Sequence, residues 1–332
     1  MPGASGNTQR IRRLQARALL WFLFSVPFPA ISTAQGSDLD LSAVAVPSNS
    51  TILVHSDLVL IPVTVTDRSG TVVNGLQKEH FTLFEDKVPQ VITHFGAEDS
   101  PASIGLLFDI SQSMGPKIEK AREAVAALLR QAHAEDEFFL APFSSVAELA
   151  VPMTNRRDVI QRRVDSLKVG GTTALLDALM LGMEEMKKAR HERKAIVIIS
   201  DGEDNASRRS LEEFKASVRE GDTVIYAIGI DTGTPNTNRT MSQWQRMTGS
   251  AFLREITEQT GGRLIEVSKP KQLPVAASRI GEWLRRQYVL GYTPNSATRN
   301  GAYHRIEVKL SKPKGFPRLH AYWRLGYYAP AE

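Results

Sequence analysis

The chain has 332 residues, of which 42% are hydrophobic, so it is long enough for two domains with a sizeable core. It contains no cysteine, which excludes disulfides, thiolate metal sites and thiol nucleophiles. Its seven histidines are scattered without a His-x-x-x-His pair or a cysteine partner, which argues against a zinc site.

Residues 1–34 have the pattern of an export signal. Four arginines precede the apolar stretch 18–31, and Ser32-Thr33-Ala34 forms a small-x-small cleavage site. The short apolar length and its two prolines argue against a retained transmembrane anchor. We therefore expect an exported protein that is periplasmic, envelope-associated or secreted, and that meets a membrane only if the signal stays uncleaved.

Removal of residues 1–34 changes the charge balance, because this segment holds four arginines and no acid. The 41 basic residues of the whole chain then fall to 37, against 36 acidic ones. The remaining chain is nearly neutral and has no dense basic patch interleaved with aromatic residues. We therefore expect no nucleic-acid partner.

The segment after the signal is expected to contain a flexible linker over 35–50 and the first part of a β-rich domain over 51–98. Residues 67–70 have the composition of a turn. Strand-like segments are expected at 56–66, 81–84 and 90–95. This flank alone is too small to bury much surface.

Residues 101–285 alternate between apolar runs and helical patterns. The expected strands are 103–109, 136–143, 194–200 and 223–230, and the expected helices are 116–132, 156–167, 174–189 and 208–220. This order predicts an α/β fold, a doubly wound, mostly parallel, Rossmann-like sheet with helices on both faces. Parallel strands buried on both faces read as continuous apolar runs, as residues 195–199 do.

An Asp-x-Ser-x-Ser pattern, formed by Asp109, Ser111 and Ser113, follows the first of these strands. Residues two apart in an extended segment project to the same side, so these three oxygen-bearing side chains can converge. Hydroxyls and a carboxylate suit a hard divalent cation such as Mg²⁺. The pattern alone is weak evidence, because Asp and Ser are also ordinary turn and helix-capping residues.

Two further segments strengthen the prediction of a metal site. A glycine turn at 170–171 runs through Thr172 and Thr173 into a helix, and Asp201 follows the strand at 194–200. In this order the three segments resemble the metal-ion-dependent adhesion site of a von Willebrand factor A (VWFA) domain. Both Asp109 and Asp201 stand at carboxyl ends of expected strands, where ligands of doubly wound folds bind.

The resemblance implies that Ser111, Ser113 and a loop threonine touch the cation, while Asp109 and Asp201 bind it mainly through water. Mg²⁺ is the expected ion, with Mn²⁺ or Ca²⁺ as alternatives. A cation held directly by neutral hydroxyls remains electrophilic, so an Asp or Glu of a protein partner can complete its coordination.

Two threonines compete for the loop position. Thr173 stands four residues before Asp177, as in the usual Thr-x-x-x-Asp-Ala form of the motif, and is preferred over Thr172. A helix N-cap is the alternative role for the other threonine.

Two polar segments near this site carry open interpretations. Residues 231–254 are expected to form an extended loop near the ligand-facing rim, which either shapes partner choice or is a mobile insertion. The residues after Asp201, which are Glu203, Asp204 and Asn205, either support the site or simply solvate the loop, and the second is favoured.

Residues 286–330 are expected to form the second part of the β-rich domain. Strands are expected at 287–292, 303–310 and 320–328, so both flanks supply about six strands for one small β-sandwich around the inserted domain. Four segments of the two flanks carry a second resemblance: Gly75-Leu76, Phe81-x-Leu83-x-Glu85-Asp86, Tyr288-x-Leu290-x-Tyr292 and the terminal Gly326-Tyr327-Tyr328. Together they resemble the acidobacterial-type VWFA-related exported family. That resemblance covers nearly the whole chain after the signal.

Enzyme motifs are missing from the sequence. There is no Gly-x-Ser-x-Gly elbow, no phosphate-binding Gly-x-x-x-x-Gly-Lys loop and no Gly-x-Gly-x-x-Gly turn. We therefore expect a protein-binding, adhesion-type module that is not an enzyme and takes no small-molecule substrate. A structural envelope protein with a purely structural metal, or a metal-dependent hydrolase, is the alternative.

Overall fold

The computed structural model describes residues 58–329, except 98, 231–248, 295–300, 312, 314 and 317. The expected export signal and linker lie outside the described residues, as does most of the expected loop 231–254. Its last part was predicted wrongly, because residues 249–254 open a helix. Within the described residues, no helix has the length and apolar character needed to cross a membrane.

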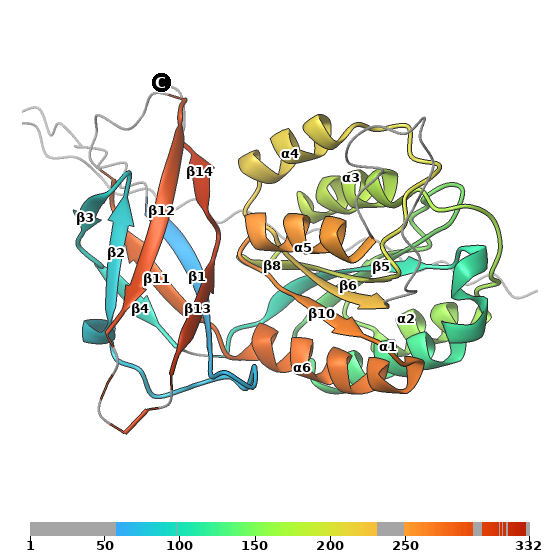
Figure 1. The fold of residues 1–332 in the computed structure, drawn as a ribbon, viewed down its shortest axis with the longest axis horizontal. Coiled ribbons are helices and arrows are strands. Elements are labelled where there is room, and N and C mark those ends of the chain that lie inside the picture. The colour runs from blue at the N-terminus through green and yellow to red at the C-terminus, as the bar shows by residue number, and fades with distance from the viewer. Residues whose placement is uncertain are drawn as a thin grey trace, which may run out of the picture. The chain divides into compact units, whose positions relative to one another are not determined.

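A six-stranded sheet forms the centre of the α/β part, with strand order β10-β9-β8-β5-β6-β7 (Figure 1). Its strands are β5 (Ala102–Asp109), β6 (Glu137–Phe143), β7 (Val151–Thr154), β8 (Arg193–Ser200), β9 (Val224–Ile230) and β10 (Leu264–Val267). All neighbours pair in parallel except β7, which lies antiparallel at one edge. The predicted doubly wound, mostly parallel sheet is therefore confirmed, and β7 and β10 extend it beyond the four strands that were expected.

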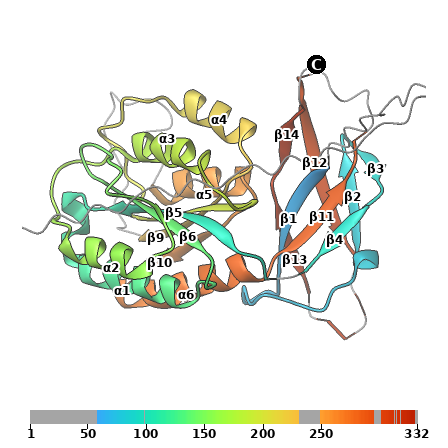
Figure 2. The ribbon, with the colours of Figure 1, turned by 180° about the vertical axis from the view of Figure 1, so that it is seen from behind.

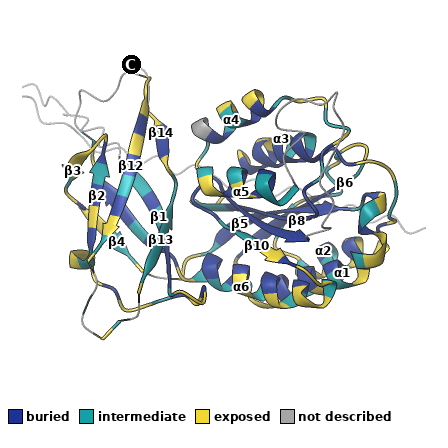
Figure 3. Cartoon of the chain, in the orientation of Figure 1, coloured by how far each residue is buried: buried dark blue, intermediate teal, exposed yellow. Residues whose placement is uncertain are grey.

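Helices cover both faces of this sheet, as the two opposite views show (Figures 1 and 2). One face carries α1 (Ile118–Arg130), α2 (Arg157–Ser166) and α6 (Leu273–Arg285), and the other carries α3 (Leu175–Met186), α4 (Leu211–Glu220) and α5 (Gly249–Gln259). Short 3₁₀-helices occupy Lys78–His80, Gln112–Lys117 and Pro270–Gln272. Figure 3 shows the reason for this layering, because the central strands are buried along their length and every residue of β5 is buried.

The two flanks together form two four-stranded sheets, with orders β13-β1-β11-β4 and β14-β12-β2-β3. Their strands are β1 (Val59–Thr66), β2 (Phe81–Glu85), β3 (Val88–Gln90), β4 (His94–Gly96), β11 (Tyr288–Tyr292), β12 (Tyr303–Leu310), β13 (His320–Trp323) and β14 (Gly326–Tyr328). Residues of both sheets, including Ile61, Leu83, Leu290 and Ile306, share one buried cluster. The predicted sandwich formed by both flanks is confirmed.

Two segments that were expected to be single strands are divided in the structure. Residues 90–95 end β3 and begin β4, and residues 320–328 contain both β13 and β14. In each case the two strands belong to different sheets, so the chain crosses the sandwich between them. Ile92 lies buried in the crossing, which explains why the apolar pattern continues where the strand does not.

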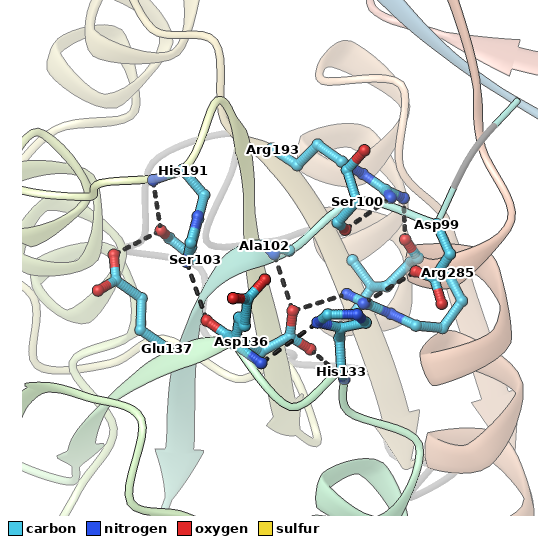
Figure 4. A network of polar contacts seen from close by, with 12 residues as sticks. Asp99, Ser100, Ala102, Ser103, His133, Asp136, Glu137, His191, Arg193 and Arg285 are labelled. Carbon is cyan, nitrogen blue, oxygen red and sulfur yellow. Dashed lines mark hydrogen bonds and ion pairs between the residues drawn. The ribbon is translucent and has the colours of Figure 1, made fainter. Parts of the chain in front are cut away.

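The chain enters and leaves the α/β part at neighbouring points, which a polar network joins (Figure 4). The buried Asp136 carboxylate accepts hydrogen bonds from the backbone N–H groups of Ala102 and His133, at 2.8 and 2.7 Å. Arg285, at the end of α6, donates to Asp136 at 3.1 Å and to Asp99 at 3.0 Å. Arg285 therefore ties the residues just before β5 to the end of the last helix.

Candidate metal centre

The two aspartates of the predicted site lie at the same edge of the central sheet. β5 ends at Asp109 and β8 ends at Ser200, and the two strands are parallel neighbours with Phe108 opposite Ile199. Asp201 follows directly, so both carboxylates stand beyond the carboxyl ends of adjacent strands. This is the edge at which doubly wound folds hold ligands.

Asp109 is buried and has a hydrogen bond to each carboxylate oxygen. The Ser111 backbone N–H donates to Oδ1 at 2.8 Å, and the Ser200 hydroxyl donates to Oδ2 at 2.6 Å. Burial raises the pKa of Asp109 to about 6, and the nearby Asp201 adds to this effect, while the hydrogen bonds from Ser111 and Ser200 oppose it. Ser200 was not predicted; its place beside Asp201 at the strand end was the available indication.

The two serines of the motif lie side by side. Their Oγ atoms are 3.1 Å apart, with Ser111 buried and Ser113 half-buried. Ser111 directly precedes the 3₁₀-helix that begins at Gln112, so the strand opens at once into a tight turn. The two serine hydroxyls therefore lie together, and Asp109 is joined to their loop through the Ser111 backbone N–H.

The glycine turn lies against the serine loop. The Gly170 N–H donates to the Ile110 carbonyl at 2.8 Å, and the Gln112 N–H donates to the Gly171 carbonyl at 3.0 Å. Gly171 has φ +85°, a conformation that favours glycine. These backbone bonds bring the threonine loop to the edge that holds Asp109.

The two threonines differ in their surroundings. The Thr172 hydroxyl is exposed and donates to Ser145 Oγ at 2.8 Å. Thr173 is only 2% exposed, and its hydroxyl makes no hydrogen bond with any residue in the described ranges. Neither residue caps the following helix, because the N-cap of α3 is Ala174, so the alternative role of an N-cap does not apply. The geometry favours Thr173 as the residue with a free hydroxyl.

Asp204 and Asn205 hold the loop that contains Thr173. The favoured interpretation, that these two residues only solvate the loop after Asp201, was therefore wrong. Asp204 Oδ2 accepts from the Leu176 N–H in the first turn of α3 at 2.8 Å. Asn205 Oδ1 accepts from the Thr173 N–H at 2.8 Å. The loop after β8 thus fixes the start of α3, and these contacts join segments about 30 residues apart.

Asp201 carries the unusual feature of the site. Its side chain is 0% exposed, and its Oδ2 accepts a hydrogen bond from Lys117 Nζ at 3.0 Å. Its other oxygen, Oδ1, is buried and has no hydrogen-bond partner among the described residues. Buried polar atoms are normally paired, so this oxygen has the free lone pairs that a cation would use. Burial and the neighbouring Asp201 also raise the pKa of Glu203. The positive charge of Lys117 partly offsets this rise.

The side chains that could serve as metal ligands at this edge are hydroxyls and aspartates. In the described part of the chain, no group of three or more His, Cys, Asp or Glu residues could hold a metal ion by themselves. Ser111, Ser113 and Thr173 add neutral oxygens to the two carboxylates, and oxygen ligands of this kind fit Mg²⁺, Mn²⁺ or Ca²⁺. Thr173 comes to this edge on the loop whose backbone is bonded to Ile110 and Gln112.

Comparison with known proteins finds a family model that matches the segment containing these residues. Residues 104–203 match the family model described as von Willebrand factor type A domain, and this segment contains all five predicted site residues. The magnesium-chelatase 67 kDa subunit of Chlorobaculum tepidum is 32% identical over 140 residues, which cover 37% of this chain and 23% of that protein. An uncharacterized protein of Borreliella burgdorferi is 22% identical over 185 residues, covering 50% of this chain and 54% of that protein.

The chain therefore spans about half or less of the length of these curated relatives. Among solved structures, the von Willebrand factor type A protein from Catenulispora acidiphila is 11% identical, with a TM-score of 0.48. That similarity covers 83% of this chain and 75% of the other. Residues 104–203, less than a third of the chain, thus form a segment that matches the von Willebrand factor type A domain.

Proposed function

We propose that this chain is an exported adhesion-type module that grips an acidic side chain of a protein partner through a bound divalent cation. The residues that would hold the cation are Asp109, Ser111, Ser113, Thr173 and Asp201. One observation carries the proposal: Asp201 Oδ1 is buried and has no hydrogen-bond partner among the residues that the structure describes, at the edge where the paired serine hydroxyls lie. Mg²⁺ suits these oxygens best, and Mn²⁺ or Ca²⁺ are alternatives.

The protein's own groups prepare this site. Ser200 and the Ser111 backbone hold Asp109 in place, so that the serine loop is fixed to the strand end. Asn205 fixes the Thr173 backbone and leaves the Thr173 hydroxyl available. A bound divalent cation would supply an open coordination position, which a partner carboxylate can fill.

The alternative of a purely structural metal is less well supported. The loops that carry the site are already joined by direct hydrogen bonds between Gly170 and Ile110, between Gln112 and Gly171, and between Thr173 and Asn205. An ion is therefore not needed to keep these loops together. Such preformed loops favour a metal that serves recognition.

The enzymatic alternative has one argument in its favour, the similarity to a magnesium-chelatase subunit. This chain covers only 23% of that protein, so the similarity concerns one domain. The proposal for this chain remains a binding module that is not an enzyme. Ser113→Ala would test a hydrolase, because turnover that depends on the site would vanish with this hydroxyl.

The first experiment measures metal binding directly by calorimetric titration of the purified chain with Mn²⁺. Asp109→Asn should lose binding, because the substitution removes a buried carboxylate of the site. Asp165→Asn on the exposed side of α2 is the matched control and should bind as the wild type does. Equal Mn²⁺ affinity in the wild type and in Asp109→Asn would overturn the proposal.

The second experiment tests the partner chemistry. The chain is immobilised, and an envelope-protein fraction is passed over it in Mg²⁺, in chelator, and after carbodiimide amidation of the fraction's carboxyl groups. Capture should require Mg²⁺ and should disappear after amidation, since the partner would then lack carboxylates. Capture that persists in chelator would contradict a metal-mediated contact.

A further inference from the structure

Lys117 is placed at the metal-binding edge by the 3₁₀-helix that follows the serine motif. Its Nζ lies 3.0 Å from Asp201 Oδ2, and the two side chains are 13% and 0% exposed. Most other ion pairs of the described residues have at least one partner that is half exposed, such as Lys120 with Glu123. The pair between Lys117 and Asp201 is therefore enclosed, where charges interact more strongly than at an open surface.

The charges around this edge are mostly negative. Asp201 lies close enough to Asp109 and to Glu203 to raise the pKa of both. Lys117 acts in the opposite direction on Glu203. The ammonium group thus neutralises part of an acidic cluster that would otherwise contain buried like charges.

Only one of the two Asp201 oxygens is used by this contact. Lys117 occupies Oδ2, while Oδ1 has no partner in the described part of the chain. A divalent cation at Oδ1 would lie close to the ammonium group, and the two positive charges would repel each other. A lysine side chain is long and flexible, and this one reaches the surface, so it can turn outward.

We propose that the ammonium group of Lys117 competes with the divalent ion for the carboxylate of Asp201. This inference rests on the proposed function, because it concerns the same site. In the metal-free protein the ammonium group stabilises the buried Asp201 carboxylate. When a divalent ion binds, the ammonium group is displaced, and this exchange lowers the affinity of the site for the ion.

The test compares neutral and charged replacements by Mn²⁺ titration. Lys117→Met should bind Mn²⁺ about tenfold more tightly than the wild type, because removing a nearby unit charge removes a repulsion of this order. Lys117→Arg keeps the charge and should bind with about wild-type affinity. Lys120→Met, three residues further along the chain in the first turn of α1 and paired with Glu123 at the surface, is the matched control and should show no change.

A second readout does not use metal affinity. In chelator, Lys117→Met should unfold at a lower temperature than the wild type, because Asp201 then has a buried charge without a partner. Saturating Mn²⁺ should remove this difference. Lys117→Gln is a second uncharged variant, used in case Lys117→Met does not fold, because its amide can still donate to Asp201. It should also bind Mn²⁺ more tightly than the wild type.

The outcomes separate the two proposals. Wild-type Mn²⁺ binding combined with equal or weaker binding by Lys117→Met and Lys117→Gln would overturn the role of Lys117 and leave the metal site standing. If Lys117→Met binds Mn²⁺ and the wild type does not, the result would support the proposal, with competition strong enough to block the wild-type site. Absence of Mn²⁺ binding in every variant would overturn the metal site, and the role of Lys117 with it.

Discussion

The hydroxyl of Tyr292 on β11 donates a hydrogen bond of 3.0 Å to Oε1 of Glu85 on β2, and thereby joins the two sheets of the sandwich. The Tyr327 hydroxyl donates to the same oxygen at 2.6 Å. Burial raises the pKa of both tyrosines, so both hydroxyls stay protonated and remain donors. Glu85 comes from the first flank and both tyrosines come from the second, so this contact locks together chain segments on either side of the inserted domain.

Replacing Glu85 should therefore weaken the sandwich. We expect Glu85→Ala to lower the free energy of unfolding by about 3 kcal/mol, because two buried hydroxyls lose their acceptor. Glu85→Gln keeps an acceptor oxygen and should lose less. Urea unfolding followed by circular dichroism measures both, and equal stabilities of the two variants would argue against the hydrogen bonds as the cause.

Removing Arg285 should destabilise the junction of the α/β part. Arg285→Met leaves the buried Asp136 without its ion-pair partner, and breaking a buried pair costs about 3 kcal/mol. Arg162→Met, at an exposed ion pair on α2, should change stability by less than about 1 kcal/mol. Thermal unfolding of the two variants checks the contrast, and similar losses would show that burial of the pair is not decisive.

Asp204→Ala should loosen the start of α3. The substitution removes the acceptor of the Leu176 N–H, and the loss of a cap of this kind costs about 1–2 kcal/mol. Chemical denaturation would measure the loss, with the exposed Asp165→Ala as the comparison. An unchanged midpoint would mean that the helix start is held by other contacts.

Stability should depend on pH through Glu137. Burial acts to raise the pKa of Glu137, but hydrogen bonds from Arg190 and Ser103 outweigh it, so this pKa lies below its ordinary 4.5. A carboxyl group with a lowered pKa in the folded state stabilises the fold above its ordinary pKa, and this contribution is lost as the pH falls through the folded value. The free energy of unfolding should therefore decrease on acidification below 4.5.

Glu137→Gln should flatten this part of the pH profile, since the amide does not titrate. The measurement is a series of urea titrations at decreasing pH for the wild type and the variant. If both profiles fall equally over this range, other carboxyl groups cause the dependence.

Chelation should abolish partner binding without unfolding the α/β part. The loops at the metal-binding edge are held by backbone hydrogen bonds, among them those of Gly170 and Gln112, and the layered core lies beneath them. The far-ultraviolet circular dichroism spectrum should therefore be unchanged in chelator. Loss of helical signal on chelator addition would show that the ion is structural.

The central sheet could be predicted because buried parallel strands leave continuous apolar runs in the sequence, as 195–199 does. The sandwich strands were harder to delimit. Apolar alternation continues through Ile92, where the chain passes from one sheet to the other, and the pattern does not tell which sheet a residue serves. Helix α5 was not predicted, because its buried residues Phe252, Leu253 and Ile256 follow a long polar stretch.

The motif residues of the candidate site could be found from their spacing in the sequence. The residues that form hydrogen bonds with the motif aspartates could not. Lys117 contacts Asp201 across 84 positions, and Ser200 contacts Asp109 across 91. Such pairs depend on which strands become neighbours, and no local pattern records that. The alternative of a threonine N-cap could not be decided for the same reason, since Asp204, 28 residues away in sequence, accepts from the Leu176 N–H.

The contact between Asp99 and Arg285 has a mechanical consequence. The chain leaves the sandwich just before β5 and returns to it just after α6, and this ion pair bridges the two connecting segments. Both connecting segments lie at the amino-terminal end of β5, whereas Asp109 lies at its carboxyl end, so a force on the sandwich would reach the candidate metal centre through the length of the central sheet.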